Sequence, residues 1–215
     1  MTKELDGLIV RVIDYKESSL IIHLLTNNKI ESIIARGVKK LNSKLKGYIL
    51  SFNYVKCFIS DSKIPILTDI LVIDEYKNIQ NNIRKNMYAG SLINILYKEQ
   101  YENMKVYELA LKSIKFINDF DEEYYYNLFL LKNLHFMGLG LNVEVNNLKD
   151  IIGFNITESK VCYKNDSTSI DLNKEDTIKL IEAYYSKLEE KVDIDLKKLH
   201  DFLVSYYLIH ASIKI

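Results

Sequence analysis

The chain has 215 residues, 48% of them hydrophobic and 27% charged, a balance that is typical of folded proteins and argues against disorder. Its 29 basic and 29 acidic side chains cancel, which argues against a protein that binds nucleic acid through overall charge alone. We expect a cytoplasmic protein, because the sequence shows no signal-peptide pattern, no apolar stretch of about 20 residues and only two cysteines, Cys57 and Cys162.

The first part of the chain is rich in β-branched and aromatic residues. Its segments predict strands at 7–14, 19–26, 30–36, 48–59 and 64–73, with a turn at Asn27–Asn28 and Pro65 near the start of the last strand. In the third strand Ile30 and Ile34 would share one face. In the fourth, one face would carry four alternate residues: Leu50, Phe52, Tyr54 and Phe58. Five short strands predict a small closed barrel, although an SH3-like barrel or a meander has a similar strand count.

Beyond residue 75 the apolar residues recur at helical spacing. They predict helices at 78–99, 106–117 and 122–137, the last ended by Gly138. A polar stretch, 146–172, contains weak strand-like pieces at 151–152 and 161–163. Asn173 is a predicted N-cap for a helix running towards Leu188, and a final helix is predicted at 195–210.

These elements define an α+β protein with two domains. We expect an N-terminal five-stranded, OB-like β-barrel at residues 1–75. It would be followed by an all-helical C-terminal domain at residues 76–215, which carries the irregular stretch around 146–172 as an insertion.

The sequence shows no pattern typical of a catalytic, metal or cofactor site. None of the four histidines accompanies a nucleophile motif: His23, His135, His200 and His210. Gly138–Leu139–Gly140 lacks the third glycine and the preceding strand of a dinucleotide fingerprint, and no Walker motif is present. We therefore expect a protein that is not an enzyme and has no cofactor.

Positive charge is concentrated between two predicted strands. Residues 1–80 carry 12 basic and 9 acidic side chains, and the segment 29–47 has six basic residues against Glu31 alone. The loop 36–47 predicts a DNA-binding site because basic side chains neutralise phosphates and release counterions. The candidate residues are Arg36, Lys39, Lys40, Lys44 and Lys46. A solvated loop that only maintains solubility is the alternative.

Tyrosine is abundant, with 16 copies. An AT-rich genome would explain this composition. Alternatively, aromatic side chains such as Tyr48 or Tyr54 would stack on bases beside the basic loop.

The N-terminal segment resembles the RecO family of DNA-repair proteins. The resemblance lies in Gly7–Ile22 with its Asp-Tyr-Lys-Glu-Ser turn, in the Ala35-Arg36-Gly37 step into the basic loop, and in Ser43–Gly47. The helix end at 128–140 is similar too. The family implies an OB-fold followed by a helical domain, and makes the basic loop a DNA contact.

The resemblance also implies a function in recombinational repair. A nucleoid-associated mediator would bind single- and double-stranded DNA, anneal complementary strands and help load RecA onto DNA covered by single-strand-binding protein. RecR and the single-strand-binding protein would be its partners. Many family members have a four-cysteine zinc module in the second domain, but here only Cys162 lies in the corresponding stretch. We therefore expect no metal and a degenerate module.

A protein-interaction adaptor is the alternative function. The helical part would then carry the activity, without significant intrinsic DNA binding, and the barrel would be a rigid platform. Zero net charge and the larger, apolar-rich C-terminal part favour this reading.

Overall fold

The computed structural model describes residues 2–99, 103–143 and 148–215. The chain forms two compact units, Met1–Glu122 and Glu123–Ile215. The first contains the larger sheet and three helices, and the second contains three further helices and a small sheet. The expected boundary after residue 75 coincides with the end of the last strand of the larger sheet. The first compact unit continues to Glu122, because it also includes the helices that follow.

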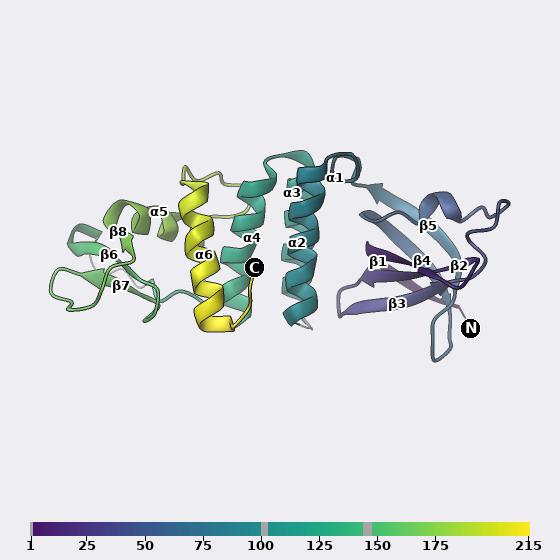
Figure 1. Cartoon of the computed structure of the whole chain (residues 1–215), viewed down its shortest axis with the longest axis horizontal. Coiled ribbons are helices and arrows are strands. Elements are labelled where there is room, and N and C mark those ends of the chain that lie inside the picture. The colour runs from purple at the N-terminus through teal and green to yellow at the C-terminus, as the bar shows by residue number, and fades with distance from the viewer. Residues whose placement is uncertain (1, 100–102, 144–147) are drawn as a thin grey trace. The chain divides into compact units, whose positions relative to one another are not determined.

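The first unit begins with a five-stranded antiparallel sheet (Figure 1). Its strands are β1 (Thr2–Tyr15), β2 (Ser19–Leu25), β3 (Ile30–Ala35), β4 (Asn53–Ser60) and β5 (Leu67–Glu75). They lie in the order β3-β2-β1-β4-β5, so the long β1 is central. The Ile34 N–H donates to the Pro65 carbonyl at 2.9 Å, and Ile34 pairs in parallel with Ile66. The edge strand β3 is therefore hydrogen-bonded to residues 65–66, which lead into the opposite edge strand, β5.

One face of this sheet forms an apolar core. Its buried members are Ile9, Ile22, Leu24, Ile33, Ala35, Val38, Ile49, Val55, Cys57, Ile59, Leu67 and Ile70. In β4 the odd-numbered residues are buried and the even-numbered ones are partly exposed. Tyr54 and Phe58 lie on the same face of β4, as expected. This face is the one opposite the apolar core. In β3 the core likewise takes Ile33, whereas Ile34 is partly exposed.

The expected strand over residues 48–52 was wrong. A short 3₁₀ helix, η1 (Lys46–Tyr48), takes its place, and Phe52 adopts a φ of 66° directly before β4. Left-handed backbone at Phe52 interrupts an extended strand, since strand residues need negative φ. The apolar run at 48–52 therefore turns the chain into the sheet instead of extending β4.

Three helices complete the first unit. They are α1 (Lys77–Asn81), α2 (Ile83–Glu99) and α3 (Met104–Asp119). The single helix expected at 78–99 is broken at Asn82, whose φ of −119° and ψ of 118° are extended. Asn118 in α3 holds the start of α1, because its Oδ1 accepts from the N–H groups of Asn78 and Ile79 at 3.1 and 3.2 Å.

The second unit is built around α4 (Glu122–Phe136), which is buried on most of its sides. Gly138 follows α4 with a φ of 72°, which confirms its expected role as a helix stop. The other helices are α5 (Lys174–Tyr185) and α6 (Leu196–Ala211). The expected N-cap of α5 is confirmed, since the Asn173 side chain accepts from the N–H group of Asp176. At the start of α6 the Asp195 side chain also caps the helix, accepting from the N–H group of Lys198. Helix α5 ends at Tyr185, before the expected Leu188.

The expectation of an all-helical C-terminal domain was wrong. After η2 (Leu148–Asp150), a small antiparallel sheet forms from β6 (Ile151–Asn155), β7 (Lys160–Tyr163) and β8 (Leu172–Asn173), in the order β7-β6-β8. The pieces at 151–152 and 161–163 are therefore real strands, anchored by the burial of Phe154 and Val161. Of the expected insertion at 146–172, residues 146 and 147 lie outside the described residues.

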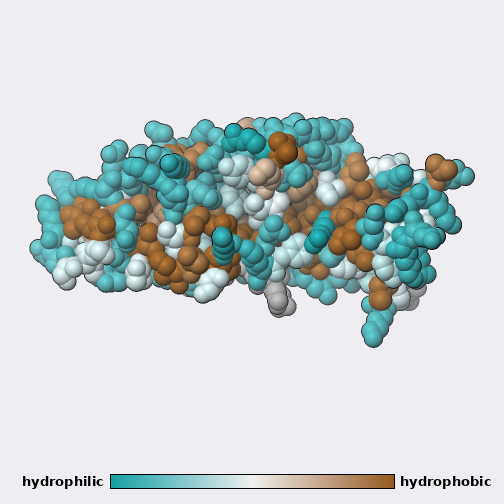
Figure 2. Space-filling model, viewed as in Figure 1, coloured by the Kyte–Doolittle hydropathy of each residue, from teal (hydrophilic) through white to brown (hydrophobic). Residues whose placement is uncertain are grey.

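On the face shown in Figure 2, apolar side chains form separate patches between hydrophilic residues. Within the described parts of the chain, no helix combines the length and the apolarity needed to cross a membrane.

Candidate nucleic-acid interface

The basic loop between β3 and β4 has a defined conformation. Its backbone folds into consecutive turns, with Lys40 N–H donating to Gly37 O at 3.2 Å and Ser43 N–H to Lys40 O at 3.1 Å. Val38 is only 1% exposed and anchors the loop in the apolar core of the larger sheet. The Lys39 N–H donates to the carbonyl of Ser18 at 3.0 Å, which ties the loop to the turn between β1 and β2.

Gly37 allows the sharp exit from β3. Its φ is 67°, a conformation that side chains with a Cβ rarely adopt. Its N–H donates to the Ser19 hydroxyl oxygen at 3.4 Å. Arg36, before this turn, and Lys40, after it, line the same opening.

That opening is a groove of about 490 Å³ at the end of the β1–β2 hairpin. Its lining residues come from β1, β2, β3 and the two connecting loops: Tyr15, Lys16, Ser18, Ser19, Ile34, Arg36, Gly37 and Lys40. Three of them are cations and none is an acid. A groove with one sign of charge attracts anions such as phosphate groups more strongly than a flat surface does.

The structure brings together only some of the predicted site residues. Arg36 and Lys40 line the groove. Lys39 instead pairs with Asp14, the Nζ and Oδ1 atoms being 3.0 Å apart. Lys44 and Lys46 are exposed further along the loop and do not line the groove.

The groove contains a cation and an aromatic ring that were absent from the expected set. Lys16 Nζ lies 5.3 Å from the centre of the Tyr15 ring, and both residues line the groove. In the sequence, Lys16 is a single lysine in a turn, and nothing in its neighbours indicates a binding site. Only the antiparallel pairing of β1, β2 and β3 brings Lys16 next to Arg36.

The two tyrosines proposed for base stacking differ in accessibility. Tyr48 is 48% exposed beside the loop. The Tyr54 hydroxyl lies 3.3 Å from that of Tyr107 in α3. Tyr54 therefore faces a helix of its own unit and does not contribute to the groove, where Tyr15 is the aromatic residue.

The histidines have structural contacts. His200 Nδ1 lies 2.9 Å from Asn127 Oδ1, and His210 Nε2 lies 2.7 Å from the carbonyl oxygen of Ile156. In β2, the His23 ring meets the Tyr97 ring edge-on at 6.2 Å. Burial, followed by the charge of Arg11, lowers the pKa of His23.

The cysteines are both buried. Burial, reinforced by Asp6, raises the pKa of the Cys57 thiol to about 12, so this thiol is not a nucleophile at neutral pH. Cys162 Sγ lies 3.5 Å from the Thr168 hydroxyl within the small sheet region. Over the described ranges, no three His, Cys, Asp or Glu side chains are grouped so that they could hold a metal ion.

Comparison with known proteins finds similarity to RecO proteins. Residues 1–76 match the family model described as recombination protein O N terminal, which covers all five strands of the larger sheet. A DNA repair protein RecO of Halalkalibacterium halodurans is 24% identical over 86% of this chain and 78% of its own length. The first 76 residues of this chain are therefore similar to the N-terminal part of RecO proteins.

Other RecO proteins match a smaller part of this chain. Those of Roseiflexus sp. and Bacillus pumilus are 24% and 31% identical over 53% of this chain. The matches span 41% and 46% of those relatives, less than half of their length. Among solved structures, the Stn1–Ten1 complex of S. pombe contains a chain that is 13% identical over 42% of this one and 74% of that one. Its TM-score is 0.27, too low to carry a structural argument.

Proposed function

We propose that this chain acts in DNA repair and recombination as a DNA-binding protein without catalytic activity. The observation that carries the proposal is the groove that Lys16, Arg36, Lys40 and Tyr15 line together at one end of the larger sheet. The match of this sheet to the RecO N-terminal family supports the same reading.

The groove suits a nucleic-acid backbone. Lysine and arginine neutralise phosphates and release condensed counterions, which drives binding that does not depend on sequence. Tyr15 offers a ring on which any base can stack. The partial closure of the sheet between Ile34 and Ile66 supports an OB-like barrel, a fold that binds oligonucleotides across its second and third strands.

The finer steps of the proposal follow the RecO family. The chain would bind single- and double-stranded DNA, and a strand held by its phosphates would keep its base edges available for annealing to a complement. It would help load RecA onto DNA covered by single-strand-binding protein, with RecR as a partner.

Fluorescence anisotropy of a labelled single-stranded oligonucleotide, titrated at several salt concentrations, tests the proposal. The native chain is compared with a triple variant, Lys16→Ala, Arg36→Ala and Lys40→Ala. A matched control carries Lys164→Ala, Lys187→Ala and Lys197→Ala in the second unit, so both variants lose the same charge. Each lost phosphate contact is expected to flatten the log–log salt slope by about 0.7.

A slope that falls by about 1–2 in the groove variant but hardly changes in the control supports the proposal. Equal losses in both variants would mean that overall charge, rather than the groove, binds DNA. No measurable binding by the native chain would favour the adaptor function instead.

A further inference from the structure

A second groove lies in the other unit, between β8 and α6, with a volume of about 550 Å³. Its apolar walls are Ile156, Ile170, Leu172 and Phe202. Phe202 is 3% exposed and forms a fixed wall, while Ile170 is 46% exposed at the margin. The groove therefore offers apolar surface that this unit does not cover.

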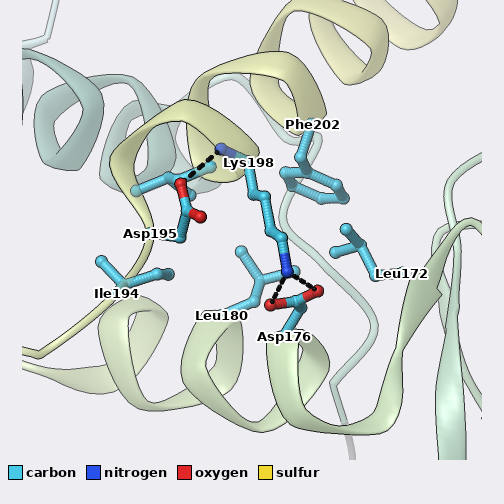
Figure 3. Close-up of a pocket in the computed structure, with 8 residues that line it drawn as sticks. Leu172, Asp176, Leu180, Ile194, Asp195, Lys198 and Phe202 are labelled. Carbon is cyan, nitrogen blue, oxygen red and sulfur yellow. Dashed lines mark hydrogen bonds and ion pairs between the residues drawn. The ribbon is translucent and has the colours of Figure 1, made fainter.

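The charged residues of this groove are mostly acidic. Asp171, Asp176 and Asp201 line it together with one base, Lys198. The Lys198 ammonium lies 3.0 and 2.9 Å from the two carboxylate oxygens of Asp176, an ion pair that joins α6 to α5 (Figure 3). Because this pair neutralises itself, the lining keeps a net charge of −2 from Asp171 and Asp201.

The ion pair also fixes the groove. Figure 3 shows the Lys198 side chain crossing between α6 and α5, beside Leu172 and Phe202. The cavity that it borders on the other side is only about 10 Å³, roughly the space of one water molecule. A ligand therefore meets a preformed wall here and not a collapsible one.

The basic loop of the first unit has the complementary properties. Leu41 is 100% exposed; Lys40 precedes it directly and Lys44 follows three residues later. The loop is held in consecutive turns and anchored by Val38, so Leu41 is presented without further ordering of the chain. A preordered apolar side chain near two cations matches an apolar groove lined by two acids, Asp171 and Asp201, that have no cation beside them in the groove lining other than Lys198, which pairs with Asp176.

We propose that the basic loop of a second copy of this chain docks in the acidic groove. Leu41 of one copy packs against Ile170 and Leu172 of the other, above the buried Phe202, and its lysines lie opposite Asp171 and Asp201. The contact joins two different surfaces, so it is heterologous and can continue from copy to copy. One leucine and a few charges bury little area, so the association is weak and falls with salt.

Sedimentation analysis of the purified full-length chain at low and high salt tests this proposal. Two variants remove opposite sides of the contact: Leu41→Asp alters the loop and leaves the groove intact, whereas Asp201→Lys alters the groove and leaves the loop intact. Leu71→Asp and Asp193→Lys are matched controls, because Leu71 is 57% exposed and Asp193 is exposed outside the groove. Circular dichroism checks that all four variants fold.

The expected result is concentration-dependent association of the native chain and of both controls at low salt, lost at high salt. Leu41→Asp and Asp201→Lys are each expected to be monomeric, yet a mixture of the two should form one-to-one heterodimers and stop there. A native chain that stays monomeric at low salt overturns the proposal, as does a mixture that fails to associate. Because DNA is absent, this outcome is independent of the anisotropy experiment.

Discussion

Lys132 in α4 donates from its ammonium to the carbonyl oxygen of Ala183 in α5, at 2.9 Å. It also donates to the carbonyls of Tyr184 and Ser186. The last carbonyls of a helix have no partner within the helix, and α5 ends at Tyr185. A side chain from a neighbouring helix thus caps α5 and fixes it to the centre of the second unit.

Replacement of this cap should destabilise the second unit. Lys132→Met keeps much of the side-chain length but removes the ammonium donor from three carbonyls, of which only Ala183 O keeps a side-chain donor, the Ser186 hydroxyl. This loss is expected to cost about 1–3 kcal/mol of unfolding free energy. Urea unfolding followed by circular dichroism measures the loss. Lys187→Met, at an exposed lysine, is the control and should change little. Equal effects of the two variants would contradict the capping role.

The same lysine predicts a pH dependence. Burial lowers the pKa of Lys132 from 10.5 to about 8, despite an opposing contribution from Glu190. Between these pH values the unfolded chain binds more protons than the folded one, so this group makes stability rise with pH across that window. The difference in unfolding free energy between the native chain and Lys132→Met should therefore grow from pH 8 to pH 10. A difference that shrinks over this range would contradict the lowered pKa.

Asn118 makes a comparable link in the first unit. Its Oδ1 accepts from two N–H groups at the start of α1, and its backbone carbonyl accepts from the Asn78 side chain at 3.0 Å. Asn118→Ala leaves buried donors without an acceptor and is expected to cost about 1–3 kcal/mol. Asn81→Ala, at an exposed residue of α1, is the control for thermal unfolding. If both substitutions lower Tm equally, the hydrogen bonds to Asn118 do not stabilise the position of α1.

Local features were predictable from the sequence, and long-range ones were not. The N-cap at Asn173 and the stop at Gly138 depend on residues within a few positions, so their patterns indicated these helix ends. The core face of β4 depends on which side of the sheet the rest of the chain packs. The turn at Phe52 likewise depends on tertiary contacts, since its N–H donates to Ile9 O at 2.7 Å from the neighbouring strand.

The candidate site shows the same division. Arg36 and Lys40 could be proposed because the basic loop is visible in the sequence. Lys39 pairs with Asp14, and Lys16 lines the groove, because of the register in which β1 pairs with β2. No local sequence pattern indicates this register. The small sheet of the second unit was underestimated because its strands are short and lie in a polar stretch.

Lys39 and Lys40 are neighbours in the basic loop, but only Lys39 forms an ion pair with Asp14. Lys40 is exposed at the groove, whereas Lys39 lies 3.0 Å from Asp14. Lys40→Ala should flatten the salt slope of single-strand binding by about 0.7, and Lys39→Ala should leave the slope nearly unchanged. Anisotropy titrations of the two variants make the comparison. A larger change in slope for Lys39→Ala would place the DNA contact outside the groove.

Gly7, the first residue of the segment that resembles the RecO family, sits where two strands approach closely. A Cβ at this position would lie 2.4 Å from the backbone oxygen of Leu25 and 2.9 Å from the Leu24 side chain. The backbone oxygen belongs to β2 and cannot rotate away, so Gly7→Ala must shift β1 against β2. We expect a loss of about 1–3 kcal/mol, as for other overpacked sites.

Gly47→Ala is the matched control, because a Cβ at Gly47 would meet no atom within 4 Å. We expect it to change the unfolding free energy by less than about 0.5 kcal/mol, since Gly47 is exposed in η1. Urea unfolding of both variants gives the comparison. If Gly7→Ala proved as mild as Gly47→Ala, the close approach of β1 to Leu25 would not constrain the pairing of β1 with β2. The placement of Lys16 beside Arg36 by the β1–β2 hairpin would then lose its structural support.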